Sequence, residues 1–99
     1  MALMLAVARR LVEGDAFMRS GRFHGWGAGL LLGKELSGAI LGIVGMGRIG
    51  LATALRARAF GMKVVFYSRS AKPRIEEKYG FARVTFLELL RSADVVSLH

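Results

Sequence analysis

Short apolar runs alternate with more polar stretches over residues 39–99, and this pattern predicts a repeating strand–helix order. The run Ala39–Val44 is continuously apolar and lies between glycines, which is typical of a strand buried on both faces of a parallel sheet. A helix is expected over about residues 48–60, with Gly61 as its C-cap, and Lys63–Tyr67 predicts the next strand. One face of this helix is expected to consist of Ile49, Ala52 and Ala59, with Leu55 beside it.

The residues after the second strand continue the alternation. Pro73–Tyr79 predicts a short helix that ends at Gly80, because proline suits the first helical turn. Ala82–Val84 predicts a brief strand, the Thr85–Glu88 pattern of a capping box opens another helix, and Val95–Leu98 predicts a last strand. Strands that alternate with helices favour a parallel sheet joined by right-handed crossovers, so we expect an α/β fold.

The first residues predict a helix with one apolar face. Leu3, Val7 and Leu11 recur at helical spacing, and Gly14 is the expected end of the helix. The apolar stretch Ala2–Ala8 is far shorter than the roughly 20 residues that cross a bilayer. In a signal peptide the positive charge precedes the apolar run, whereas here it follows. We therefore expect a cytoplasmic protein without a membrane partner.

Residues 17–36 combine frequent glycines with large apolar side chains such as Phe23 and Trp26. The glycines break any regular period, while apolar groups of this size need a surface that covers them. That surface is either the same domain or a second subunit, and the pattern leaves both interpretations open. We divide the chain into an N-terminal helix and arm over residues 1–37 and a second domain over residues 38–99.

Composition narrows the class of protein. The chain has 99 residues, which suits one small domain or a piece of a larger protein, and 54% of them are apolar, which excludes intrinsic disorder. The absence of cysteine excludes a disulfide framework, cysteine-bound zinc and a thiol nucleophile. The net charge of +8 invites a nucleic-acid hypothesis, but the basic residues are scattered singly or in pairs. We expect neither a nucleic-acid partner nor a metal site.

A glycine motif follows the first predicted strand. Gly45, Gly47 and Gly50 have the spacing G-x-G-x-x-G, with a buried strand before them and a helix after them. The first glycine allows a tight turn, the second lets a pyrophosphate approach the backbone, and the third allows close packing of helix on sheet. The amides of Arg48 and Ile49 then lie at a helix N-terminus, which favours an anion. We expect these five residues to bind a dinucleotide in part of a Rossmann-type sheet; the other interpretation is a purely structural strand–turn–helix.

The end of the second strand bears on the choice of cofactor. An NAD site usually has an acidic residue about 20 positions after the glycines, where it bonds the ribose 2′-hydroxyl. Ser68 and Arg69 occupy that place, and no acid is present. Ser68 removes a charge that would repel a 2′-phosphate, and Arg69 can donate charge-assisted hydrogen bonds to one. The pair favours NADP(H), or use of both cofactors; alternatively Arg69 stacks on the adenine and NAD(H) is used.

Together these residues resemble the D-isomer-specific 2-hydroxyacid dehydrogenase family. The resemblance rests on Ala8–Arg10, Gly25–Trp26, Leu36–Gly38, Leu41–Gly50, Ala59–Met62, Tyr67, Leu87–Leu90 and Ser92–His99. It spans nearly the whole chain, and Tyr67–Arg69 looks most like the glyoxylate and hydroxypyruvate reductase branch. The resemblance implies hydride transfer between NADP or NAD and a 2-oxo or 2-hydroxy acid. It also implies that the apolar arm over residues 17–36 packs in a homodimer.

The chain departs from the family's pattern in ways that affect function. Ser68 stands where the family commonly has Asp, which argues against a strict NAD preference, and Ala39–Ile40 replaces a frequent Lys-Thr. In the family, the catalytic arginine, glutamate and histidine follow the last strand predicted here, and the small substrate domain lies mostly before the first helix, so we expect these parts to be absent from this sequence. Neither His24 nor His99 matches the family's acid/base histidine. We therefore assign no catalytic residue and expect an inactive fragment of such an enzyme. The alternative is a stand-alone, non-catalytic module that binds a dinucleotide and dimerises.

Overall fold

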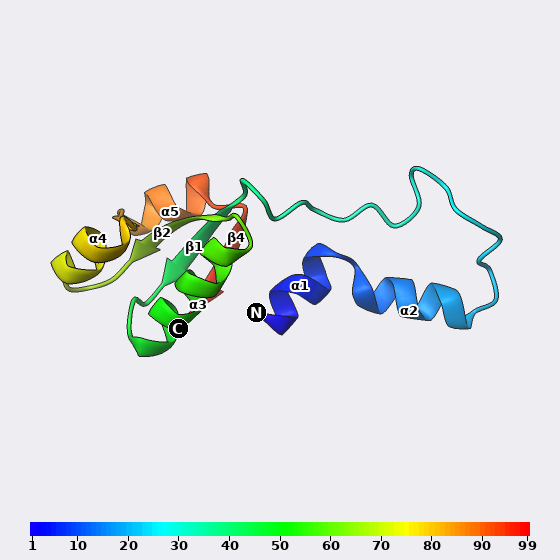
Figure 1. Ribbon diagram of the computed structural model, residues 1–99, viewed down its shortest axis with the longest axis horizontal. Coiled ribbons are helices and arrows are strands. Elements are labelled where there is room, and N and C mark those ends of the chain that lie inside the picture. Colours follow the sequence, from blue (N-terminus) through cyan, green and yellow to red (C-terminus); the bar gives the residue numbers. More distant parts are fainter. The chain divides into compact units, whose positions relative to one another are not determined.

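A four-stranded parallel sheet in the order β3-β2-β1-β4 forms the centre of residues 36–99 (Figure 1). The computed structural model describes every residue from Met1 to His99, and the chain divides into two units, Met1–Glu35 and Leu36–His99. The strands of the second unit are β1 (Ile40–Val44), β2 (Lys63–Tyr67), β3 (Ala82–Arg83) and β4 (Val95–Leu98). Its helices are α3 (Arg48–Ala59), α4 (Pro73–Tyr79) and α5 (Phe86–Ser92). These elements confirm the predicted α/β fold.

The register of the sheet brings three strand ends to one edge. Val44 of β1 lies opposite Tyr67 of β2 on one side and Leu98 of β4 on the other. Because all three strands run in the same direction, the segments that follow them start at the same edge. The glycine motif and the turn after β2 are therefore neighbours in space although about twenty residues separate them in sequence.

Helices α3 and α5 cover opposite faces of the sheet, below and above it in Figure 1. Successive strand residues point to opposite faces, so the neighbours of Gly42 and Ile43 in β1 show which helix covers each face of the sheet. A Cβ on Gly42 would meet the side chain of Leu89 in α5, whereas Ile43 lies against α3 at Gly50. The largest fully buried side chains are Leu41, Ile43, Met46, Phe66 and Leu89. The core thus sits between the strands and these two helices.

The buried face of α3 differs from the prediction. Gly50, Ala54 and Ala57 are buried, whereas Ile49 is 71% exposed and Ala59 is also exposed. Small residues at helical spacing let the helix backbone approach the sheet closely, and this packing outweighs the preference for burying the largest side chain.

The predicted capping box of α5 is present, since the Thr85 hydroxyl accepts from the backbone N–H of Glu88 and the Glu88 carboxylate accepts from the backbone N–H of Thr85.

The N-terminal unit contains two helices, α1 (Ala2–Ala8) and α2 (Leu11–Arg19), rather than the single predicted one. The break falls at Arg10, which adopts the left-handed conformation with φ 52°. Gly14 was expected to end a helix but lies inside α2, where its N–H donates to the carbonyl oxygen of Arg10 at 2.9 Å. The same helix includes residues 17–19, which were assigned to the arm.

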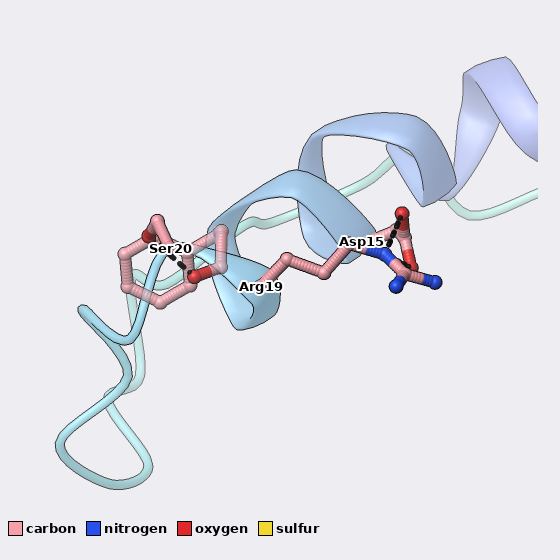
Figure 2. Close-up of polar contacts among 4 residues, drawn as sticks. Asp15, Arg19 and Ser20 are labelled. Atoms are coloured by element: carbon pink, nitrogen blue, oxygen red, sulfur yellow. Dashed lines mark hydrogen bonds and ion pairs between the residues drawn. The ribbon is translucent and has the colours of Figure 1, made fainter.

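Local polar contacts hold the end of α2, as Figure 2 shows. The Nε of Arg19 donates to both carboxylate oxygens of Asp15, at 3.0 and 2.9 Å, and the hydroxyl of Ser20 donates to the carbonyl oxygen of Phe17 at 2.7 Å. Both are exposed contacts within a few residues of sequence, so each contributes little to stability. Neither α1 nor α2 contains a buried residue.

The arm returns to α1 within the same unit. The N–H of Lys34 donates to the carbonyl oxygen of Ala8 at 2.8 Å, and a Cβ on Gly33 would lie 2.4 Å from that oxygen. Only glycine permits this close approach of the two backbones. No helix in the chain combines the length and the apolar character that a membrane span requires.

Candidate functional site: the glycine turn and the end of β2

Gly45 makes the turn out of β1 in a conformation that requires glycine. Its φ is 101°, and a Cβ there would lie 2.1 Å from the carbonyl oxygen of His99. Its N–H donates to the carbonyl oxygen of Tyr67 at 2.9 Å, so the turn begins while the chain is still bonded to β2. Gly45 therefore fixes where the chain leaves the sheet.

Gly47 is the N-cap residue of α3 and has an ordinary extended backbone, with φ −89°. A Cβ built on Gly47 would meet no protein atom within 4 Å, so neither backbone conformation nor protein packing demands glycine here. What the missing side chain leaves open is the space in front of the helix N-terminus. That is the role expected of a glycine over which a phosphate group approaches the backbone.

The first amides of α3 have no acceptor inside the protein. The first paired amide is that of Leu51, which donates to the carbonyl oxygen of Gly47 at 2.9 Å, and no side chain caps the helix. The N–H groups of Arg48 and Ile49 therefore remain available at the positive end of the helix dipole. An open hollow of about 710 Å³ lies against them, lined by Gly45, Gly47, Arg48, Ile49, Gly50 and His99.

A second hollow of about 410 Å³ lies beside the first and reaches the end of β2. The two share Gly45, Gly47 and His99, so they form neighbouring parts of one surface. The second is also lined by Val44, Met46, Tyr67, Ser68, Arg69, Ser70 and Lys72. No Asp or Glu lines either hollow, whereas Arg48, Arg69 and Lys72 do, so the surface has a positive charge that suits phosphates.

The predicted residues of the turn after β2 have different surroundings. Ser68 is 7% exposed, and its hydroxyl donates to the carbonyl oxygen of Ser70 at 2.6 Å. Arg69 is exposed, and its guanidinium forms no hydrogen bond or ion pair within the chain. The hydroxyl of Ser68 is therefore used within the turn, whereas the charged side chain of Arg69 is available to a ligand.

All seven predicted site residues line the two hollows, whether or not they bind a ligand. Lys72, Ser70 and His99 were not among the predicted site residues, although they line the same surface. Lys72 follows β2 in the same polar turn as Arg69, and that position is the signal that identifies it. No group of three His, Cys, Asp or Glu residues lies close enough together to hold a metal ion.

The site residues fit a dinucleotide. A pyrophosphate needs unpaired N–H donors and a backbone that it can approach, and both are present at Gly47–Ile49. The hollow then continues along the strand ends to the turn after β2, where an adenosine ribose is expected in a sheet of this topology.

Comparison with known proteins gives consistent matches over the whole chain. Residues 1–99 match the model of the D-isomer specific 2-hydroxyacid dehydrogenase NAD binding domain. A glyoxylate reductase from Thermococcus litoralis is 54% identical over 102 residues, which cover 99% of this chain and 31% of that protein. The chain therefore spans about a third of the length of such curated relatives.

Solved structures agree with the fold. A protein from Thermus thermophilus has a TM-score of 0.91 and 54% sequence identity, and the match covers 99% of this chain and 30% of that one. A D-lactate dehydrogenase from Aquifex aeolicus, solved with NAD and lactic acid, has a TM-score of 0.86 and 35% identity, covering 99% of this chain and 28% of that one.

Proposed function

The chain belongs to the D-isomer-specific 2-hydroxyacid dehydrogenase family, and from this premise we propose that it is the dinucleotide-binding part of an oxidoreductase acting on 2-hydroxy acids. The observation that carries the proposal is the pair of unpaired amides, Arg48 and Ile49, that face an open hollow beside Gly47. In this proposal the two amides donate to the cofactor pyrophosphate, and the Arg48 guanidinium adds a full positive charge beside them.

The adenosine end of the cofactor lies at the turn after β2. Arg69 is the exposed cation of this turn, and Lys72 lines the same hollow. A hydrogen bond donated by a charged group to a 2′-phosphate contributes roughly 1.5–3 kcal/mol to binding. An Asp in place of Ser68 would repel that phosphate, because both groups are negatively charged. We therefore propose that the chain prefers NADP(H) to NAD(H).

The substrate is proposed to be a small 2-oxo acid such as glyoxylate or hydroxypyruvate, because a relative covering this whole chain is named glyoxylate reductase. Bound nicotinamide supplies the hydride. Reduction of the carbonyl also needs a proton donor and a cation that holds the carboxylate. The cations of the two hollows are assigned to phosphates here, so we give no residue of this chain a catalytic role. The cytoplasmic location expected from the sequence stays a prediction.

We also propose that residues 17–36 form a homodimer interface. The N-terminal unit has no buried residue, and Trp26 is 88% exposed. The other exposed large apolar side chains within residues 17–36 are Met18, Phe23, Leu30 and Leu32. So many exposed apolar groups on one short segment are typical of a surface that another chain covers.

Paired calorimetric titrations of the chain with NADPH and NADH test the proposed function. We expect heat of binding from both, with the smaller dissociation constant for NADPH. If neither dinucleotide binds, the proposed site is wrong. If NADH binds more tightly, the site stands and the proposed role of Arg69 is wrong.

A further inference from the structure

Arg83 of β3 bonds the backbone at the end of the neighbouring strand. Its Nε and Nη2 donate to the carbonyl oxygen of Ser68, at 3.3 and 3.0 Å. The sheet register explains this reach, because Arg83 pairs with Phe66 and the N–H of Val84 donates to the carbonyl oxygen of Phe66 at 2.9 Å. From that position the long side chain reaches along β2 to Ser68, which is two residues beyond Phe66 and the first residue after the strand.

The turn after β2 is thus tied at two points. Within the turn, the hydroxyl of Ser68, a buried residue, donates to the carbonyl oxygen of Ser70 at 2.6 Å. From outside, the Arg83 guanidinium holds the carbonyl of Ser68 itself. Hydrogen bonds donated by a charged group are stronger than neutral ones, and a planar fork that meets one oxygen restricts the direction of that carbonyl.

Arg69 belongs to the turn that these hydrogen bonds hold, but its own side chain makes no hydrogen bond. Its guanidinium forms no hydrogen bond within the chain, so the position of the Arg69 side chain is determined by the backbone of residues 68–70 alone. If a flexible turn must become ordered when the ligand binds, the conformational entropy that is lost lowers the binding affinity. The position of the turn therefore bears directly on how well Arg69 meets a ligand.

We propose that Arg83 is a positioning residue that fixes the Ser68–Ser70 turn so that Arg69 meets the 2′-phosphate of NADP(H). This inference rests on the proposed function, because it assigns the turn to the adenosine end of the cofactor. Arg83 does not line the hollow, and it acts through the carbonyl of Ser68.

Arg83→Met tests the proposal, because it keeps an apolar stem and removes both hydrogen bonds. We expect the dissociation constant for NADPH to rise about tenfold and that for NADH to change less than about threefold. The matched control is Arg91→Met, which removes the same charge from an exposed residue of α5 that has no hydrogen bond or ion pair. A second variant, Ser68→Ala, cuts the other tie and is expected to show the same split between the two dinucleotides.

Hydrogen exchange of the unliganded chain gives a readout that does not depend on cofactor. Arg83→Met should speed exchange at the amides of residues 69–71 and leave that of residues 52–57 in α3 unchanged. Equal weakening of both dinucleotides, or unchanged exchange at residues 69–71, would overturn the positioning role. If the parent chain binds neither dinucleotide, the proposed function fails, and the exchange experiment still decides whether Arg83 holds the turn.

Discussion

A methyl group on Gly50 would lie 2.2 Å from the carbonyl oxygen of Gly45. The third glycine of the motif thus packs directly over the first, and α3 starts immediately above the turn that leaves β1. This contact places the N–H groups of Arg48 and Ile49 beside the strand ends, where the two hollows meet. The glycine at position 50 is a requirement of folding, whereas the glycine at position 47 leaves space for a ligand.

Gly50→Ala is expected to lower the free energy of unfolding by about 1–3 kcal/mol, because a backbone carbonyl stands where the methyl group must go. Urea denaturation followed by circular dichroism measures the change. Gly47→Asn is the control, since nothing in the protein lies near its Cβ and asparagine is a good N-cap. Equal stability of Gly50→Ala and the parent chain would show that the two backbones are not in contact.

Gly47→Asp is expected to keep or raise stability and to abolish dinucleotide binding. The extended backbone of Gly47 suits an N-cap residue, so the carboxylate can accept from the free amides and interact favourably with the dipole, by about 0.5–1 kcal/mol. The same carboxylate occupies and repels the site of the pyrophosphate. Thermal unfolding and calorimetry on one sample measure both effects, and binding that matches the parent chain would rule out the assignment of this site.

Arg69→Gln is expected to weaken NADPH binding by about tenfold to a hundredfold while NADH binding changes little, because only NADPH carries the 2′-phosphate. Fluorescence titration of the reduced nicotinamide follows both cofactors. Arg74→Gln is the matched control, since Arg74 is exposed in α4 and lines neither of the two cofactor hollows. Equal losses for the two cofactors would place Arg69 away from the phosphate.

Glu88 makes the stability of α5 depend on acid pH. Hydrogen bonds from the side chain of Thr85, and then from its backbone N–H, hold the pKa of the Glu88 carboxyl below its ordinary value of 4.5. A folded-state pKa below the unfolded one gives stability that is present above about pH 4.5 and is lost as the pH falls through the folded-state value.

Glu88→Gln should therefore reduce the loss of stability on acidification below about pH 4.5. The free energy of unfolding, measured by urea titration from neutral to acid pH, gives the slopes for the two chains. Glu77→Gln serves as the control, because Glu77 is exposed and no hydrogen bond to its carboxylate is formed. Identical slopes for Glu88→Gln and the parent chain would contradict the capping role in this range.

Trp26→Ser is expected to raise the dissociation constant of the proposed homodimer by about tenfold or more, as large exposed aromatic residues often dominate an interface. Sedimentation equilibrium measures the constant. Leu87→Ser removes an exposed apolar side chain from α5 instead and should leave the association unchanged. A parent chain that is monomeric at all concentrations would contradict the dimer.

Most of the fold follows from local sequence signals. The apolar runs identify β1 and β2, and the capping box at Thr85–Glu88 locates the start of α5. These signals succeed because each depends on residues close together in the chain. The spacing of the three glycines also predicts the turn out of β1 and the unpaired amides at the start of α3, because it specifies backbone positions rather than distant side chains.

Features that depend on packing could not be predicted. The face of α3 that contacts the sheet is set by Gly50, Ala54 and Ala57, since a close approach requires small residues, and hydrophobicity alone favoured Ile49. Likewise, the bond from Arg83 to Ser68 depends on the register between β2 and β3, which neither strand encodes alone. Long-range pairing therefore supplies what the local pattern leaves out.

We propose that the first amides of α3 hold the phosphates of a nicotinamide dinucleotide. Amide chemical shifts of the ¹⁵N-labelled chain, recorded during titration with NADPH, report on these amides one by one. We expect the largest shifts at Gly47, Arg48 and Ile49, followed by the turn at residues 68–70. Saturable binding that leaves the amides of residues 47–49 unshifted would show that the phosphates bind elsewhere.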